Sequence, residues 1–133
     1  MITFKEFTFE AAHQIPPHSR LHGHTFVVDL AMTGEPDALY GWAANLDEVD
    51  RVVARLKEQI DHSYLNSIPG LEVPSLENVA RWIWAKLSAD LPGLIHVGVR
   101  RGAFGHGEGC IYDGRTERLV SDPQYRLEFA EAT

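Results

Sequence analysis

Two segments near the start of the chain alternate apolar and polar residues, which is the pattern of half-buried strands. In the first, Ile2 and Phe4 share one face and Phe7 and Phe9 share the other, so we expect a bulge or a twist between the two pairs. A proline-containing loop, residues 14–20, leads to the second segment. One face of that second strand carries His24, Phe26, Val28, Leu30 and Met32.

Helical periodicity appears twice in the middle of the chain. Asn45 is expected to cap the first helix, with Glu48 three residues on as its capping-box partner. Ser75 is expected to cap the second helix, which ends before Leu91. The apolar stripe of the first helix consists of Val49, Val52, Val53, Leu56 and Ile60, and that of the second consists of Val79, Ile83, Trp84 and Leu87.

Strand patterns return at residues 94–99 and 110–112, on either side of a glycine-rich loop at 102–109. The order strand, strand, helix, helix, strand, strand predicts an α+β fold, with an antiparallel four-stranded sheet and two helices on one face. Residues 1–133 show no linker or repeat, so we expect one domain. A small sheet has exposed edges, and pairing with further copies would close them, which predicts a homo-oligomer.

Composition narrows the classes of partner. The formal net charge of −7 argues against general nucleic-acid binding, and no apolar run approaches the length of a membrane span. One cysteine, Cys110, and an N-terminus without a secretory pattern predict a cytoplasmic protein. Arg20 and the pair Arg100-Arg101 form local basic positions that suit a small phosphorylated substrate, although for each one alone solvated surface charge is the favoured interpretation.

Three histidines are the candidate chemical centre. His22 and His24 are separated by one residue of a predicted strand, so their side chains point to the same face, roughly 6–7 Å apart at Cα. His13, from the preceding strand, would complete a three-histidine site that leaves one zinc position open. Nitrogen donors favour zinc over magnesium or calcium. A chain with seven histidines also produces close pairs by chance, so spacing alone leaves both readings open.

Four motifs carry a family resemblance: Phe9–His13, Leu21–His24, Asp61–Asn66 and Pro74–Ala80. In this order and spacing, the chain resembles the 6-pyruvoyltetrahydropterin and 6-carboxytetrahydropterin synthase family from residue 2 to about residue 115. The resemblance implies a T-fold, in which sheet edges pair into barrel-like trimers. It further implies that two trimers form a hexamer with active sites at subunit interfaces.

The resemblance also implies an activity. Zinc would be held by His13, His22 and His24, and the substrate would be 7,8-dihydroneopterin triphosphate. The family eliminates triphosphate and rearranges or cleaves the pterin side chain. The carboxy branch, which feeds 7-deazaguanine and queuosine synthesis, is our leading hypothesis. The alternatives are a module that binds a pterin or purine without reaction, and an enzyme that forms a hydroxymethylpterin or 6-pyruvoyltetrahydropterin.

Further site residues follow from the resemblance. Asp61 and His62 from a neighbouring subunit would orient and activate a base, although a helix C-terminal cap explains them too. At the start of the second helix, Ser75 and Glu77 would lie beside the pterin pocket. Glu77 would accept two N–H bonds from the guanidine-like edge of a pterin, or would merely complement the helix dipole. Arg20 would contact the substrate beside the histidine pair.

The chain departs from the family pattern at three places, one of which is Asn45, where the family commonly has a helix-capping aspartate. The usual cysteine, four residues before the histidine pair, is His18, whose imidazole can also act as a base. Cys110 lies too far along the chain to replace it and is expected to be a small core residue. The family's Glu-Thr after the penultimate strand is Arg101-Gly102 here. Glu108 is the candidate substitute pterin anchor, with a solvent-exposed acid in a mobile loop as the other interpretation.

Overall fold

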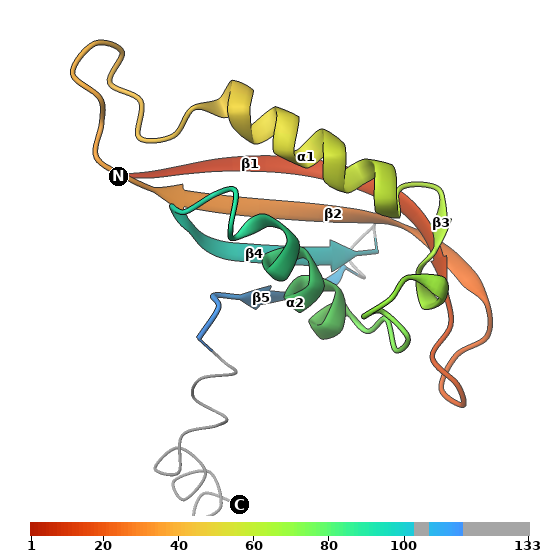
Figure 1. The fold of residues 1–133 in the computed structure, drawn as a ribbon. Coiled ribbons are helices and arrows are strands. Elements are labelled where there is room, and N and C mark those ends of the chain that lie inside the picture. Colours follow the sequence, from red (N-terminus) through yellow and green to blue (C-terminus); the bar gives the residue numbers. More distant parts are fainter. Residues whose placement is uncertain (103–106, 116–133) are drawn as a thin grey trace, which may run out of the picture.

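The computed structural model describes residues 1–102 and 107–115. They form a single sheet with two helices, which confirms the α+β prediction (Figure 1). In chain order the elements are β1 (Ile2–His13), β2 (His22–Thr33), α1 (Leu46–Ile60), β3 (Ser63–Tyr64), a 3-10 turn η1 (Leu65–Ser67), α2 (Leu76–Leu87), β4 (Leu94–Arg101) and β5 (Glu108–Tyr112). The strand order is β3-β1-β2-β4-β5.

The long hairpin of β1 and β2 is regular. Its antiparallel register runs without a break from Ile2 opposite Thr33 to His13 opposite His22. The expected bulge in β1 is therefore wrong: Phe4 and Phe7 lie on opposite faces simply because successive side chains alternate. The register shift is found instead between β2 and β4, next to Ala31.

The prediction of four antiparallel strands is also wrong, because β3 adds a fifth. Its two residues pair parallel to β1, with Ser63 opposite Ala11 and Tyr64 opposite Ala12. Two residues are too few to produce a periodic pattern, so the alternation rule cannot detect such a strand. The pairing ties the segment after α1 to the end of β1, which is where His13 lies.

The core lies between one face of the sheet and the two helices. Both helices begin at the expected caps: the Asn45 side chain accepts from the backbone N–H groups of residues 47 and 48, and the Ser75 hydroxyl accepts from that of Asn78. All five stripe residues of α1 are buried. In the sheet, the rings of Phe9 and Phe26 stack with centroids 4.8 Å apart. Burial of this apolar surface is the main stabilising contribution.

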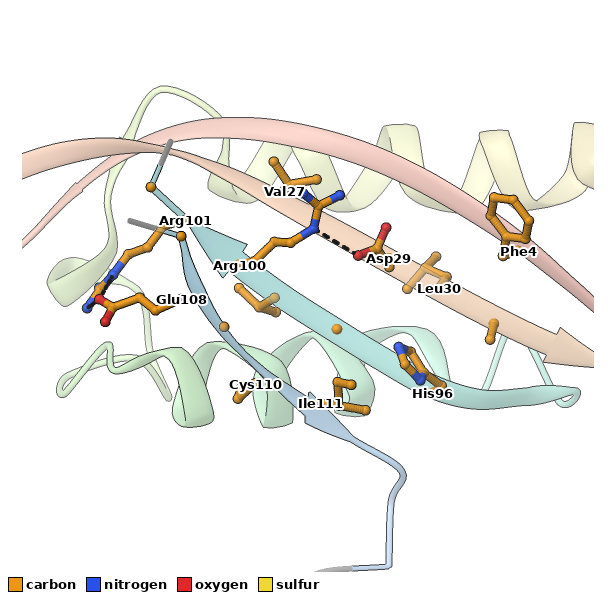
Figure 2. Close-up of a pocket in the computed structure, with 16 residues that line it drawn as sticks. Phe4, Val27, Asp29, Leu30, His96, Arg100, Arg101, Glu108, Cys110 and Ile111 are labelled. Atoms are coloured by element: carbon orange, nitrogen blue, oxygen red, sulfur yellow. Dashed lines mark hydrogen bonds and ion pairs between the residues drawn. The ribbon is translucent and has the colours of Figure 1, made fainter. Parts of the chain in front are cut away.

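The other face of the sheet is uncovered by the helices. Its exposed apolar side chains include Phe4 and Ile111, and a hollow of about 710 Å³ lies over it (Figure 2). On this face Arg100 forms ion pairs with Glu6 at 2.9 Å and with Asp29 at 3.2 Å. Across residues 1–102 and 107–115, neither helix is long and apolar enough to cross a membrane.

Candidate metal centre

Three histidines converge where β1 ends and β2 begins. One ring nitrogen from each of His13, His22 and His24 can be chosen so that all lie within 4.8 Å of one another. His13 and His22 are directly opposite partners in the strand register, and His24 follows two residues later on the same face. Phe26 forms a floor beneath them, in edge contact with the rings of His13 and His24 at centroid distances of 5.6 Å.

Backbone carbonyls determine which nitrogen of two rings carries the proton. Nδ1 of His13 donates to the carbonyl of Pro74 at 3.0 Å, and Nδ1 of His22 donates to the carbonyl of Arg20 at 2.6 Å. A carbonyl oxygen only accepts, so in the neutral rings the proton resides on Nδ1 and the lone pair on Nε2. Hydrogen bonds of this kind orient metal-binding histidines in known sites.

Within the described chain, the Arg101 guanidinium reaches this cluster and donates to Nε2 of His13 at 3.3 Å. The Nε2 atoms of His13 and His22 lie 3.1 Å apart with no proton between them in the neutral rings, and Nε2 of His24 is buried without a hydrogen-bond partner among the described residues. Zinc binds imidazole nitrogen at about 2.0–2.1 Å, which places neighbouring ligands of a tetrahedron about 3.3 Å apart. The donor set and its spacing therefore suit zinc, and this cluster can hold a metal ion.

Burial favours the neutral form of His13 and His24. It lowers the pKa of His24 to about 4, with smaller contributions in the same direction from Arg101, His22 and His13. Burial also lowers the pKa of His13, and its hydrogen bond to Pro74 opposes that shift. A metal ion competes with protons for ring nitrogens, so a depressed pKa leaves the lone pairs available at neutral pH.

The Asp61–Asn66 motif fastens the end of β1. The Asp61 carboxylate accepts from the backbone N–H of Glu10 at 2.9 Å, and the N–H of His62 donates to the Glu10 carbonyl at 2.6 Å. Asn66 accepts from the backbone N–H of Gln14 at 3.0 Å and donates to its carbonyl at 2.7 Å. These hydrogen bonds fix the backbone on both sides of His13 and so position its ring.

The predicted catalytic pair lies at the surface. Asp61 is the C-cap of α1, and its bond from Glu10 lowers the pKa of its carboxyl group. His62 has a left-handed backbone with φ of 56°, and its side chain is 80% exposed at 3.5 Å from the Asp61 carboxylate. Within the described chain, His62 is not a member of the three-histidine cluster. His62 lines an open surface hollow together with His24 of the same chain.

The loop between β1 and β2 carries two further predicted site residues. His18 is exposed in a turn whose backbone N–H bonds return to the carbonyl of Ile15. The Arg20 side chain is exposed as well, and the contact that Arg20 makes with the cluster is through its backbone carbonyl.

The start of α2 reaches the cluster through its backbone. Ser75 serves as the N-cap, and Glu77 is exposed in the first turn. The contact with the histidines is made by Pro74, whose carbonyl holds His13. The sequence analysis missed this residue, because a backbone carbonyl leaves no side-chain pattern.

The sequence analysis named Arg101 as a basic position but did not place it at the histidine cluster. Its guanidinium donates to Nε2 of His13 at 3.3 Å and to one carboxylate oxygen of Glu108 at 3.0 and 3.1 Å. Glu108 is the first residue of β5 rather than a loop residue, which corrects its predicted setting. Residues 103–106 of the predicted glycine-rich loop lie outside the described part of the chain. Alternation along β4 was the available signal, since it separates the faces of Arg100 and Arg101.

Cys110 lies on β5 and packs against the core, half-buried. Burial raises the pKa of its thiol, and the nearby Glu77 adds to the shift. A buried, protonated thiol is a poor base at neutral pH. The structure therefore supports the expectation that Cys110 is a packing residue, and the chain, whose single cysteine this is, lacks the family's usual thiol.

Comparisons with known proteins agree with this geometry. A family model described as 6-pyruvoyl tetrahydropterin synthase matches residues 2–114. A 6-carboxy-5,6,7,8-tetrahydropterin synthase from Synechocystis sp. is 43% identical over 111 residues, covering 74% of this chain and 84% of the relative. A dihydroneopterin monophosphate aldolase from Pyrococcus furiosus is 34% identical over 88 residues, covering 65% of this chain and 74% of the relative.

The fold has a close counterpart among solved structures. The structure of Caenorhabditis elegans 6-pyruvoyl tetrahydropterin synthase superposes with a TM-score of 0.76, covering 86% of this chain and 95% of that chain, at 20% sequence identity. At this identity the likeness establishes the fold, which is the predicted T-fold.

Proposed function

This chain belongs to the 6-pyruvoyl tetrahydropterin synthase family, and we propose that it is a zinc-dependent lyase acting on 7,8-dihydroneopterin triphosphate. We propose the 6-carboxytetrahydropterin synthase type, serving 7-deazaguanine and queuosine synthesis in the cytoplasm. The observation that carries the proposal is the convergence of three imidazoles. Two of them donate from Nδ1 to a backbone carbonyl, so their lone pairs reside on Nε2. The 43% identity to a relative of that name supports the choice of type.

The metal would be held by His13, His22 and His24 through their Nε2 atoms. Bound zinc would supply Lewis-acid chemistry, polarising hydroxyl or keto oxygens of the pterin side chain so that neighbouring C–H protons become removable. The chain contributes a rigid frame for this chemistry. Pro74, Arg20 and Phe26 keep the three rings oriented before any substrate arrives.

Proton transfer would be carried out by imidazole groups. His18 occupies the position of the family's cysteine and lies in an exposed turn, so its ring is free to approach a bound substrate. His62, oriented by Asp61, would act from a neighbouring subunit, which agrees with its 80% exposure and its absence from the cluster of its own chain. An imidazole can both accept and donate a proton, which suits general acid–base catalysis.

Recognition of the pterin would use carboxylates. Glu77 is exposed at the start of α2 beside Ser75 and is available to accept N–H bonds from the guanidine-like edge of the ring. Glu108 is a second acceptor, and Arg20 would contact the substrate from the loop before β2. We propose a homo-oligomer, a hexamer built as a dimer of trimers that pair through sheet edges, with the active sites at subunit interfaces.

The experiment is a product assay with zinc-loaded protein and 7,8-dihydroneopterin triphosphate. Mass spectrometry should detect 6-carboxytetrahydropterin and released triphosphate. Turnover by metal-free protein would contradict the proposal. Binding of the substrate without any product would favour a pterin- or purine-binding module instead.

A second reaction has support of its own. His18 replaces the usual cysteine, and one relative is named dihydroneopterin monophosphate aldolase at 34% identity. An aldol-type cleavage would yield a hydroxymethylpterin. The same assay distinguishes the two reactions by product mass when the monophosphate is supplied in parallel, and 6-pyruvoyltetrahydropterin would be recognised in the same way.

A further inference from the structure

Arg101 brings a permanent positive charge to the three-histidine cluster. It is the last residue of β4, and its side chain is only 20% exposed. One Nη donates to Nε2 of His13 at 3.3 Å, while Nε and the other Nη donate to a single oxygen of Glu108. Arg100, one residue earlier, leaves the strand in another direction and pairs with Asp29 over the uncovered face (Figure 2).

The contact between Arg101 and Nε2 of His13 is incompatible with a metal ion bound to the same nitrogen. The Nε2 lone pair of His13 cannot bind a cation and accept from Arg101 at the same time. A guanidinium also does not lose its proton, so it repels a nearby divalent ion. When a metal binds, Arg101 must leave His13, and its positive charge must be balanced by a negative group beside the metal.

In the described structure the negative group beside Arg101 is the Glu108 carboxylate, and it balances the charge of Arg101 poorly. Glu108 engages Arg101 through one oxygen, and its side chain is 64% exposed, so water competes strongly for it. A planar guanidinium fork prefers two acceptor oxygens in its own plane, as carboxylate and phosphate groups provide. An oxyanion at the open position of the metal would satisfy both the fork and the metal.

We propose that Arg101 is an oxyanion-binding residue of this site, which recognises a carboxylate or phosphate group of the substrate beside the metal, with Glu108 as the exchangeable partner that holds it in the anion-free state. This inference rests on the proposed function, because it assumes that the cluster binds a metal. It assigns a chemical role to one departure from the family pattern, in which Arg101-Gly102 stands where the family has Glu-Thr. It also frees Glu108, when the anion is present, to accept N–H bonds from the substrate.

The test uses the full-length protein loaded with Co²⁺, whose visible absorption reports ligands entering the coordination sphere. Four proteins are compared: wild type, Arg101→Gln, Glu108→Gln and the matched control Arg100→Gln. Each is titrated separately with inorganic phosphate and with acetate, so that the two sources of oxyanion are distinguished. Affinity for Co²⁺ itself is measured first, by competition with a chelator and without added anion.

The proposal predicts that wild type binds at least one of the two anions and that Arg101→Gln binds it about tenfold or more weakly, the loss expected for a charged hydrogen bond. Glu108→Gln should bind the anion more tightly, and Arg100→Gln should match wild type. Without anion, Arg101→Gln should bind Co²⁺ more tightly than wild type, because a repelling charge has been removed.

Equal anion affinities in wild type and Arg101→Gln, or an equal loss in Arg100→Gln, would overturn the role of Arg101. So would a wild-type site that binds neither anion. In these cases normal Co²⁺ binding and normal pterin turnover would leave the proposed function standing. Failure of all four proteins to bind Co²⁺ would overturn both proposals together, because both require the metal.

Discussion

His13 and His22 direct their Nε2 atoms at each other across 3.1 Å, although the Nδ1 of each ring already donates to a backbone carbonyl. Two lone pairs at this distance repel unless a cation lies between or beside them. In the described structure the Arg101 guanidinium lies beside the pair and donates to Nε2 of His13 at 3.3 Å, so it offsets part of this repulsion while the two rings keep the arrangement that a metal requires. The strand register and two carbonyls, from Pro74 and Arg20, make the arrangement rigid.

Removing one ligand should abolish both metal binding and turnover. His24→Ala takes away one of three nitrogens, a buried Nε2 for which residues 1–102 and 107–115 provide no hydrogen-bond partner. We therefore expect no bound zinc and no detectable product, with a folded protein of unchanged or slightly higher stability. Metal analysis, product assay and circular dichroism check this outcome. His96→Ala is the control, since His96 lines the hollow on the other face of the sheet and should retain zinc.

The bond pair between Asn66 and Gln14 should matter for both stability and metal affinity. Asn66→Ala removes two part-buried hydrogen bonds to the residue that follows His13. We expect the free energy of unfolding to fall by about 1–3 kcal/mol and the zinc affinity to fall with it. Urea unfolding and chelator competition measure the two effects. Ser67→Ala, which loses one exposed bond to the Tyr64 carbonyl, should change stability by less than about 0.5 kcal/mol.

The metal-free protein should lose stability in mild acid. The pKa of His24 is about 4 in the folded state and 6.5 when unperturbed. Above the higher value neither state binds the proton, so His24 makes no pH-dependent contribution. As the pH falls from 6.5 toward 4, His24 binds a proton in the unfolded chain but not in the folded chain, so the free energy of unfolding decreases.

Urea unfolding of zinc-free protein across that pH window measures the decrease. His24→Asn should show a shallower dependence on pH, with the remainder due to His13, whose pKa is also lowered. An identical slope in wild type and His24→Asn would show that His24 does not titrate in this way.

Subunit mixing tests whether His62 acts across an interface. His62→Ala and His24→Ala should each be inactive, the first with zinc bound and the second without. If each site combines three histidines of one subunit with His62 of another, random mixed oligomers would contain intact pairs at about a quarter of their sites. Recovered activity in the mixture, measured after dissociation and reassembly, is the expected result. No recovery, or a monomer in size-exclusion chromatography, would contradict the interfacial site.

Regular elements were predictable from the chain because each has a period. The stripe from Val49 to Ile60 defined α1 and its buried face, and the alternation from His24 to Met32 defined the core face of β2. The same alternation brought His22 and His24 to one face. The two-residue strand β3 escaped prediction because it is shorter than any period, and its pairing depends on where α1 ends.

The environment of the site was harder to predict because it is assembled from distant segments. The proton position on His13 depends on a carbonyl 61 residues away, at Pro74. Arg101 reaches His13 across 88 residues of sequence, and only the β1-β2-β4 strand order brings the two together. Residue type suggested surface charge for Arg101, whereas its position at the end of β4 directs it to the cluster.

X-ray absorption at the zinc edge of the loaded wild-type protein tests the central claim most directly. The account predicts three imidazole nitrogens at about 2.0–2.1 Å and one further light-atom ligand in a four-coordinate shell. A sulfur ligand, a shell of oxygens alone, or the same spectrum from His24→Ala would contradict the three-histidine site.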